Sequence, residues 1–256
     1  MINFHTLKKA ACTIAAIRVP IEEASRFGVL NTREDGSVYE FEEKPAKPKS
    51  TLASMGIYVF SAEKLYEYLE EDNSDPASSN DFGKDVLPKM LKAGEKMMAY
   101  EFSGYWKDVG TISSLYEANM DLLGDSPLFD IADTSWKIQS RSPLAPPQYI
   151  GDGATTSNSI IMSGCEIYGT VENSVLASGV TVGKGACVKN SIIMAETVIG
   201  ENSVVDYSII DENARIGKKC MIGESKEKSA GITVVARNLS LKDGTVITGG
   251  QIVDKV

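Results

Sequence analysis

The sequence contains a single histidine, His5, and this scarcity limits the chemistry that the chain can support. Catalysis by a Ser-His-Asp or Cys-His arrangement would have to depend on His5 alone. Its position in a helix-like stretch near the N-terminus favours a partly exposed structural residue. Enzymes built around a histidine base are therefore poor candidates.

The few cysteines and the lack of a long apolar run exclude further classes. No two cysteines form a CxxC pair, so neither a zinc site nor dithiol redox chemistry is expected. The simplest interpretation is that the cysteines are reduced, in a cytoplasmic protein. No stretch approaches the roughly 20 apolar residues of a membrane span, and the first fifteen residues lack the features of a signal peptide. The cysteines are Cys12, Cys165, Cys187 and Cys220.

Positive charge is also in short supply. Lysine and arginine together number 26 against 35 acidic residues, which gives a formal charge of −9. This balance argues against a nucleic-acid groove, which needs clustered basic side chains. A few local cations can still hold a phosphate. With 43% apolar residues, the 256-residue chain can form one large domain or two ordinary ones.

Residues 1 to about 125 alternate strand-like and helix-like segments, which predicts an α/β layer architecture. Strands are expected at 12–19, 38–43 and 54–60. Helices are expected after Ser61, around residues 86–91 and after Thr111. We expect Thr111 to cap the last of these helices, which would run to Leu123 with Gly124 just past its end.

The segment SMGIYVF, residues 54–60, has polar residues at alternate positions. The strand period of two places Ser54, Gly56 and Tyr58 on one face. We expect them to form a shallow polar shelf. The intervening residues would enter the core. These are Met55, Ile57 and Val59.

From about residue 148 the helical period is replaced by aliphatic residues six positions apart, such as Ile210, Ile216 and Ile222. Aliphatic or aromatic residues also precede glycine at intervals of about three such steps. This spacing predicts a left-handed parallel β-helix, with one aliphatic side chain per flat side pointing inward. The residues before glycine are Ile150, Tyr168, Val182, Ile199, Ile216 and Ile222.

Three regions are therefore expected: residues 1–125, 126–147 and 148–256. The middle region is rich in proline, serine and aspartate and is interpreted as a linker. The β-helix by itself is interpreted as a structural or oligomerisation module.

Candidate chemistry lies in three short motifs of the first region. FEEKP, residues 41–45, places two carboxylates and Lys44 at a strand end, and SSNDFGKD, residues 78–85, leads into a helix. There Asp81 can cap the helix or accept hydrogen bonds from sugar hydroxyls. In YWKDVGT, residues 105–111, Trp106 can stack on a sugar or base, and Asp108 can ligate a divalent cation near a phosphate.

Together these motifs resemble the bacterial glucose-1-phosphate adenylyltransferases. The resemblance rests on RFGVLN, FEEKP, LASMGIYVF, SSNDFGKDVLPKM and YWKDVGTISSLYEANMDLL, and it covers nearly the whole chain. It implies the last part of a Rossmann-like nucleotidyltransferase domain followed by a left-handed parallel β-helix. It also implies the synthesis of ADP-glucose and pyrophosphate from ATP and glucose 1-phosphate in glycogen biosynthesis.

The resemblance also implies roles for particular residues. Lys44 would pair with the phosphate of glucose 1-phosphate and, with Asp108, would be catalytic. Asp108 would be one of two Mg²⁺ ligands, and Trp106 would pack nearby. The other implied substrate-binding residues are Gly28, Glu43, Ser54, Tyr58, Asp81 and Phe82.

The sequence departs from the family in one respect. It contains no glycine-rich loop of the GGxGxRL type, which wraps the ATP triphosphate, and no counterpart of the second metal-binding aspartate. We therefore expect the chain to correspond to about the last two-thirds of such an enzyme. We expect it to be inactive alone, because ATP binding would require the N-terminal part.

Other interpretations stay open. The chain can be a non-catalytic subunit that modulates a partner, or another sugar-nucleotide pyrophosphorylase, such as one using mannose 1-phosphate and GTP. A β-helix acyltransferase is disfavoured because no histidine follows His5. By analogy with the family, the β-helix is expected to assemble a homo-oligomer, a tetramer in particular, with no nucleic acid or membrane partner.

Overall fold

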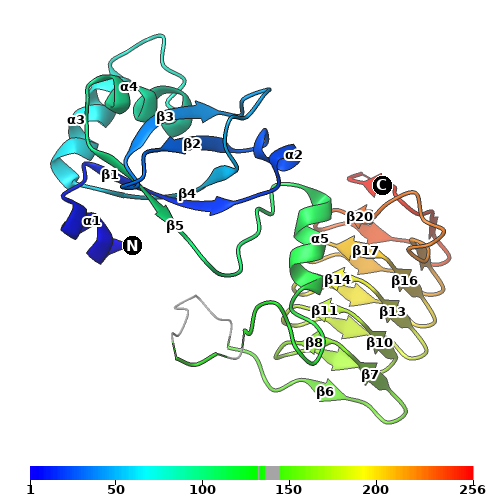
Figure 1. The fold of residues 1–256 in the computed structure, drawn as a ribbon. Helices are drawn as coiled ribbons and strands as arrows, with labels where there is room; N and C mark the ends of the chain where they lie inside the picture. Colours follow the sequence, from blue (N-terminus) through cyan, green and yellow to red (C-terminus); the bar gives the residue numbers. More distant parts are fainter. Residues whose placement is uncertain (132, 136–143, 256) are drawn as a thin grey trace. The chain divides into compact units, whose positions relative to one another are not determined.

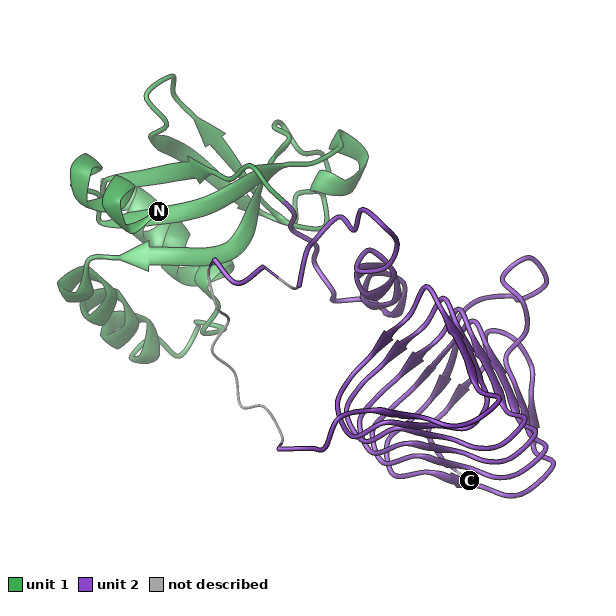
Figure 2. Ribbon diagram, turned by 90° about the horizontal axis from the view of Figure 1, so that it is seen from below, with its two compact units in different colours: residues 1–104 green, residues 105–256 purple. Residues whose placement is uncertain are grey.

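The computed structural model describes residues 1–131, 133–135 and 144–255, which form two compact units, Met1–Gly104 and Tyr105–Val256 (Figure 1, Figure 2). None of the helices in these ranges combines the length and apolar character that a bilayer crossing requires. Part of the predicted linker, at 132 and 136–143, lies outside the described residues, as does Val256. The predicted boundaries at 125 and 148 stay predictions.

The first unit is a five-stranded mixed sheet flanked by short helices, with strand order β3-β2-β4-β1-β5 (Figure 1). Strand β1 pairs antiparallel with β4 and parallel with β5. The α/β prediction is confirmed. In chain order the elements are α1 (Ile2–Lys8), β1 (Cys12–Arg18), α2 (Ile21–Ala24), β2 (Gly28–Thr32), β3 (Val38–Glu43), β4 (Leu52–Phe60), α3 (Ala62–Asn73), the π-helix η1 (Phe82–Val86), α4 (Leu87–Lys92) and β5 (Met97–Glu101).

The core of this unit lies between the sheet and the helices α3, η1 and α4. Leu87 and Met90 of α4 are fully buried against Ile14 of β1 and Leu30 of β2. Burying side chains of this size contributes about 1.5–3 kcal/mol each. His5 is also buried, at 9% exposure, and its Nδ1 lies 2.9 Å from the Thr13 hydroxyl. The expectation that it would be partly exposed was wrong, because α1 packs its histidine against the sheet.

The predicted faces of β4 were also wrong. Ile57 is 49% exposed, and Met55 and Val59 are only half-buried, while Ser54 is buried. The cause is a bulge. Ile14 pairs with Tyr58 and Ala16 with Ser54, so three residues of β4 stand opposite one of β1. Gly56 lies at the centre of this bulge with φ +69°, a backbone angle that favours glycine.

The second unit is the predicted left-handed parallel β-helix, preceded by helix α5 (Ile112–Met120) (Figure 2). Three six-stranded parallel sheets form the flat sides of a triangular prism, so the described strands make six coils.

Each side contributes one strand per coil. The first side consists of β6 (Tyr149–Ile150), β9 (Glu166–Ile167), β12 (Thr181–Val182), β15 (Val198–Ile199), β18 (Arg215–Ile216) and β21 (Ser240–Leu241). The second consists of β7 (Thr155–Ser157), β10 (Thr170–Glu172), β13 (Cys187–Lys189), β16 (Val204–Asp206), β19 (Met221–Ile222) and β22 (Val246–Ile247). The third consists of β8 (Ile160–Ile161), β11 (Val175–Leu176), β14 (Ile192–Ile193), β17 (Ser208–Ile210), β20 (Thr233–Val235) and β23 (Ile252–Val253).

The interior of the prism confirms the six-residue step. Ile210, Ile216 and Ile222 are at most 2% exposed and belong to one apolar cluster along the axis. Two residues differ from the expectation. Tyr168 is 39% exposed because the preceding Ile167 takes the inward position, and Ile150 is 43% exposed in the first of the described coils.

One corner of the prism carries a row of asparagine side chains with left-handed backbone angles. The amide of Asn158 donates to Oδ1 of Asn173 at 2.8 Å, and that of Asn173 donates to Oδ1 of Asn190 at 2.9 Å. Asn190 in turn donates to Oδ1 of Asp206 at 3.0 Å. Tyr207 occupies the next left-handed corner, with φ +45°. Asparagine tolerates this conformation better than other non-glycine residues.

Helix α5 begins as predicted and ends earlier. Thr111 caps it and, with Ser114, forms a capping box. The helix ends at Met120 with Asp121 as its C-cap, so the prediction that it runs to Leu123 was wrong. Tyr116 turns inward and packs against Ile192 and Ile209 of the β-helix.

Candidate functional site

The FEEKP motif lies at the end of β3, where Glu43 pairs with Gly28 of β2. Lys44 follows in a left-handed conformation, with φ +48°, and its backbone N–H donates to the carbonyl of Phe27. The ammonium of Lys44 is exposed and lies 3.7 Å from Oε1 of Glu43. The tight turn leaves this ammonium free to contact a solute beside the Glu43 carboxylate.

The carboxylate of Glu43 sits between two glycines. A Cβ at Gly28 would lie 3.0 Å from Oε2 of Glu43 and would overlap the ring of Phe41. A Cβ at Gly83, in η1, would overlap Oε2 of Glu43 itself. Both glycines are therefore required for this carboxylate to reach its position. Gly83 was missed by the sequence analysis, although it lies within the DFGKD motif.

Tyr58 and Phe82 form the apolar side of the same cluster. Their ring centroids are 5.6 Å apart with planes inclined by 25°, and Phe60 packs against both rings. Both Tyr58 and Phe82 pack against the buried core of the unit. Offset-stacked aromatic pairs contribute about 0.5–1.5 kcal/mol beyond the area that they bury.

The Tyr58 phenol lies close enough to the carboxylates of Glu43 and Asp81 for their charges to affect its pKa. Burial raises the pKa of the Tyr58 phenol, and a hydrogen bond with Ser54 opposes that rise. The negative charges of Glu43 and Asp81 raise the pKa of Tyr58 further. The phenol is therefore neutral near pH 7 and retains its proton as a hydrogen-bond donor.

Asp81 serves as a helix cap in this structure. Its Oδ1 accepts hydrogen bonds from the backbone N–H groups of Gly83 at 2.8 Å and Lys84 at 2.9 Å. Of the two alternatives for Asp81, capping is thus the one seen in the geometry. The role in sugar binding stays a prediction.

The structure brings together seven of the predicted residues within the first unit. Trp106 and Asp108 belong to the second unit. The exposed carboxylate of Asp108 folds over Gly110, where an added Cβ would stand 3.2 Å from Oδ2. Among the described residues, no group of three His, Cys, Asp or Glu side chains is placed to hold a metal ion. The seven are Gly28, Glu43, Lys44, Ser54, Tyr58, Asp81 and Phe82.

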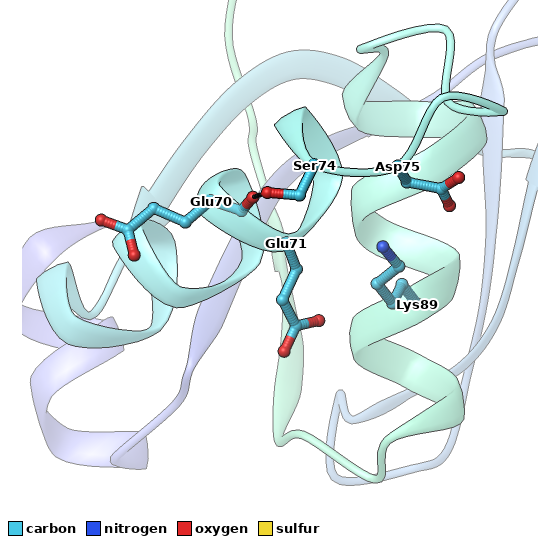
Figure 3. A pocket seen from close by; sticks show the side chains of 5 residues that line it. All are labelled: Glu70, Glu71, Ser74, Asp75 and Lys89. Atoms are coloured by element: carbon cyan, nitrogen blue, oxygen red, sulfur yellow. Dashed lines mark hydrogen bonds between the residues drawn. The ribbon is translucent and has the colours of Figure 1, made fainter.

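A separate pocket of about 540 Å³ opens between the end of α3 and helix α4 (Figure 3). The hydroxyl of Ser74 turns back to the carbonyl of Glu70 at 2.8 Å. No predicted site residue lines this pocket. Three carboxylates against one ammonium give it an acidic character that does not suit a sugar phosphate. Its lining residues are Glu70, Glu71, Ser74, Asp75 and Lys89.

Comparison with known protein families agrees with the fold. Residues 1–125 match the family described as nucleotidyl transferase, and residues 148–239 match the one described as GlmU-like, C-terminal hexapeptide. The chain therefore contains a nucleotidyl transferase domain followed by a hexapeptide-repeat β-helix. This family suggests a divalent metal.

Curated relatives that match the chain include glucose-1-phosphate adenylyltransferases. The enzyme of Clostridium beijerinckii is 54% identical over 253 residues, which cover 99% of this chain and 64% of that relative. The enzymes of Clostridium perfringens and Geobacillus stearothermophilus are 58% and 55% identical over 188 residues, or 73% of this chain and 48% and 49% of those relatives. The chain thus spans less than two-thirds of the length of these relatives.

Proposed function

We propose that this chain carries the glucose-1-phosphate site of a glucose-1-phosphate adenylyltransferase, which joins ATP and glucose 1-phosphate to give ADP-glucose and pyrophosphate in glycogen biosynthesis. The single observation that supports this most is the cluster formed by Glu43, Tyr58 and Phe82 beside the exposed ammonium of Lys44. A carboxylate and an aromatic face suit a hexose, and an ammonium suits its phosphate. The names of the relatives point to the same substrate.

Each side chain of the cluster has a chemical role in this proposal. Lys44 pairs with the phosphate as a point charge. Glu43 and Asp81 accept hydrogen bonds from sugar hydroxyls, and the neutral Tyr58 phenol donates one. Phe82 keeps the Tyr58 ring in place, and Gly28 leaves room for the Glu43 carboxylate.

We propose Mg²⁺ as the divalent metal and Asp108 as one of its ligands. Mg²⁺ is usually held by one or two carboxylates together with substrate phosphate oxygens, so a single exposed aspartate fits this mode of binding. When bound, the metal neutralises charge on the phosphates. Trp106, two residues away, would pack beside the substrate.

No protein nucleophile is needed for this reaction. A phosphate oxygen of glucose 1-phosphate attacks the α-phosphorus of ATP, and pyrophosphate leaves. The contribution of the residues described here is to bind the sugar phosphate and to hold the attacking oxygen in a fixed orientation. In this respect Lys44 acts by charge and the Glu43–Tyr58 cluster by orientation.

Isothermal titration calorimetry with glucose 1-phosphate and with ADP-glucose tests the proposal. We expect Lys44→Ala to weaken binding by about tenfold or more, since a hydrogen bond to a charged group contributes about 1.5–3 kcal/mol. Lys47→Ala, an exposed lysine three residues further on, is the matched control and should bind normally. Equal affinity of the two variants, or no binding by the unmodified chain, would exclude the proposal.

We further propose a homotetramer assembled by lateral packing of the β-helix, in a cytoplasmic protein. Flat parallel sheets offer large side surfaces, and all four cysteines are free thiols. Multi-angle light scattering at several protein concentrations measures the assembly. A monomer throughout would contradict it.

A further inference from the structure

The side chains on either side of Trp106 are held by one carboxylate. The Tyr105 hydroxyl donates to Oδ2 of Asp121 at 2.9 Å, and the Lys107 ammonium donates to the same oxygen at 2.9 Å. Asp121 is the C-cap of α5. We call these three residues, Tyr105, Lys107 and Asp121, the Asp121 clamp.

Further contacts hold the clamp in place. The Lys107 ammonium also reaches Oε2 of Glu117 at 3.1 Å, one turn earlier in α5. The ring of Phe129 packs on Tyr105 with centroids 5.8 Å apart. The chain folds back at this point, because the N–H of Leu128 donates to the carbonyl of Asp121 at 3.0 Å.

The clamp is shielded from solvent more than an ordinary surface ion pair is. The side chains of Lys107 and Asp121 are only 27% and 21% exposed. Partly buried pairs of this kind are screened less by salt than exposed ones.

Helix α5, which carries Asp121, is in turn fixed to the β-helix. The Tyr116 hydroxyl donates to the carbonyl of Asn190 at 2.8 Å. Its ring meets Tyr207 edge to face, with centroids 5.1 Å apart. Tyr207 has a left-handed backbone angle that is unusual for a bulky side chain, and such strain persists only where surrounding structure enforces it. Hydrogen bonds and ring contacts thus connect the β-helix to α5, which carries Asp121, and from there to residues 105 and 107.

The alternation of side chains along residues 105–108 indicates which residues the clamp holds in position. Residues 105–110 form no helix or strand, yet Tyr105 and Lys107 reach the same oxygen and so lie on one side of the chain. In an extended segment, Trp106 and Asp108 then point to the opposite side. We propose that Asp121 is a positioning residue for Trp106 and Asp108, and that the clamp fixes their segment to the β-helix through α5. The substrate and metal roles of these two residues rest on the proposed function.

Tryptophan fluorescence tests the proposal without any ligand. The sequence has two tryptophans, so Trp136→Phe leaves Trp106 as the only emitter. In that background we compare Asp121→Ala with Asp125→Ala, an exposed carboxylate in the same loop. Losing a hydrogen bond to a charged group should raise, about tenfold, the fraction of molecules in which the segment 105–110 is released from α5. Acrylamide quenching of Trp106 should rise and its anisotropy should fall in Asp121→Ala alone, while the thermal unfolding of the β-helix stays the same.

Tyr105→Phe provides a second and milder variant. It removes one hydroxyl and keeps the ring that packs on Phe129. We expect a smaller change of the same sign, about fivefold in the released population, because a neutral donor is lost while Lys107 stays bound. Unchanged Trp106 quenching in both variants would overturn the proposal.

A ligand titration separates this proposal from the proposed function. Trp106 fluorescence is followed as Mg²⁺ and ADP-glucose are added to the Trp136→Phe chain and to its Asp121→Ala variant. If the proposed function fails, neither chain binds ADP-glucose, yet the quenching difference remains and the clamp is supported. If the clamp fails, the two chains show equal quenching and bind ADP-glucose equally.

Discussion

The ring of Tyr58 stacks on that of Phe82, so a strand on one side of a backbone bulge and the first residue of a π-helix meet at the candidate site. The contact joins two motifs that are more than twenty residues apart in the sequence. It also places the phenol within electrostatic range of Glu43 and Asp81. Under the proposed function, folding and substrate binding would therefore depend on the same pair of rings.

Variants at the two ring positions should separate these contributions. Phe82→Ala removes the stacking partner of a half-buried ring and should lower the free energy of unfolding of the first unit by about 2 kcal/mol. Tyr58→Phe keeps the stack and should leave that stability within about 0.5 kcal/mol, while it weakens glucose 1-phosphate binding several-fold. Urea unfolding and calorimetry provide the two measurements. Equal binding by Tyr58→Phe and the unmodified chain would remove the phenol from the site.

Gly83→Ala should disturb binding more than folding. The added methyl group meets the carboxylate of Glu43, which must turn away. Alanine is favoured over glycine in helices by about 1 kcal/mol, which offsets part of the steric cost to stability. We expect about tenfold weaker binding of glucose 1-phosphate and a change in stability below about 1 kcal/mol. Lys84→Ala, the exposed next residue, is the control; if it weakens binding as much as Gly83→Ala does, the displacement of Glu43 is not the cause.

Two substitutions at Asp81 distinguish capping from sugar binding. Asp81→Ala removes the cap for Gly83 and Lys84 and should cost about 1 kcal/mol of stability. Asp81→Asn keeps a good capping group and should retain that stability. If Asp81 also accepts hydrogen bonds from the sugar, Asp81→Asn should bind glucose 1-phosphate more weakly by calorimetry. Normal binding by the asparagine variant would limit Asp81 to the structural role.

The stability of the first unit should fall at alkaline pH because of Cys12. Burial raises the pKa of this thiol to about 12, so the folded state binds its proton more tightly than the unfolded state does. The stabilisation is complete below the ordinary thiol pKa of about 8.5 and decreases by about 1.4 kcal/mol per pH unit as the pH rises toward 12.

Urea unfolding of the first unit between about pH 8 and about pH 9.5 measures this slope. Cys12→Ala should reduce the slope, although it also lowers the stability at neutral pH by creating a small cavity. Cys187→Ala, in the second unit, is the matched control and should leave the slope of the first unit unchanged. An identical slope in the Cys12 and Cys187 variants would contradict the assignment.

The β-helix could be predicted from sequence because its structure repeats locally. Ile210, Ile216 and Ile222 face inward since each coil packs only on its neighbours, and a short period in the sequence reports that packing directly. Tyr168 departs from the pattern because a buried neighbour, Ile167, already fills the inward position. A rule based on glycine spacing cannot separate two adjacent apolar residues.

The candidate site could be predicted only in part. The motif residues Glu43, Tyr58 and Phe82 do come together, whereas the exposure of Ile57 follows from a bulge that depends on pairing with β1. Strand alternation alone does not contain this information. No sequence pattern indicated a role for Asp121, because its contacts with residues 105 and 107 depend on where α5 ends. Local patterns predicted the elements, and distant contacts set the positions of the side chains.

The asparagine row at the corner of the prism has a polarity. Each side-chain amide donates a hydrogen bond to the following coil, from Asn158 to Asn173 to Asn190, and Asp206 accepts the last one. An ionised carboxylate accepts hydrogen bonds and donates none, so it ends such a row without leaving an unsatisfied donor. An extra coil with asparagine at this corner position would lengthen the row of hydrogen bonds. An extra coil with aspartate there would end the row earlier. The position of one acidic side chain thus determines where this row of hydrogen bonds ends.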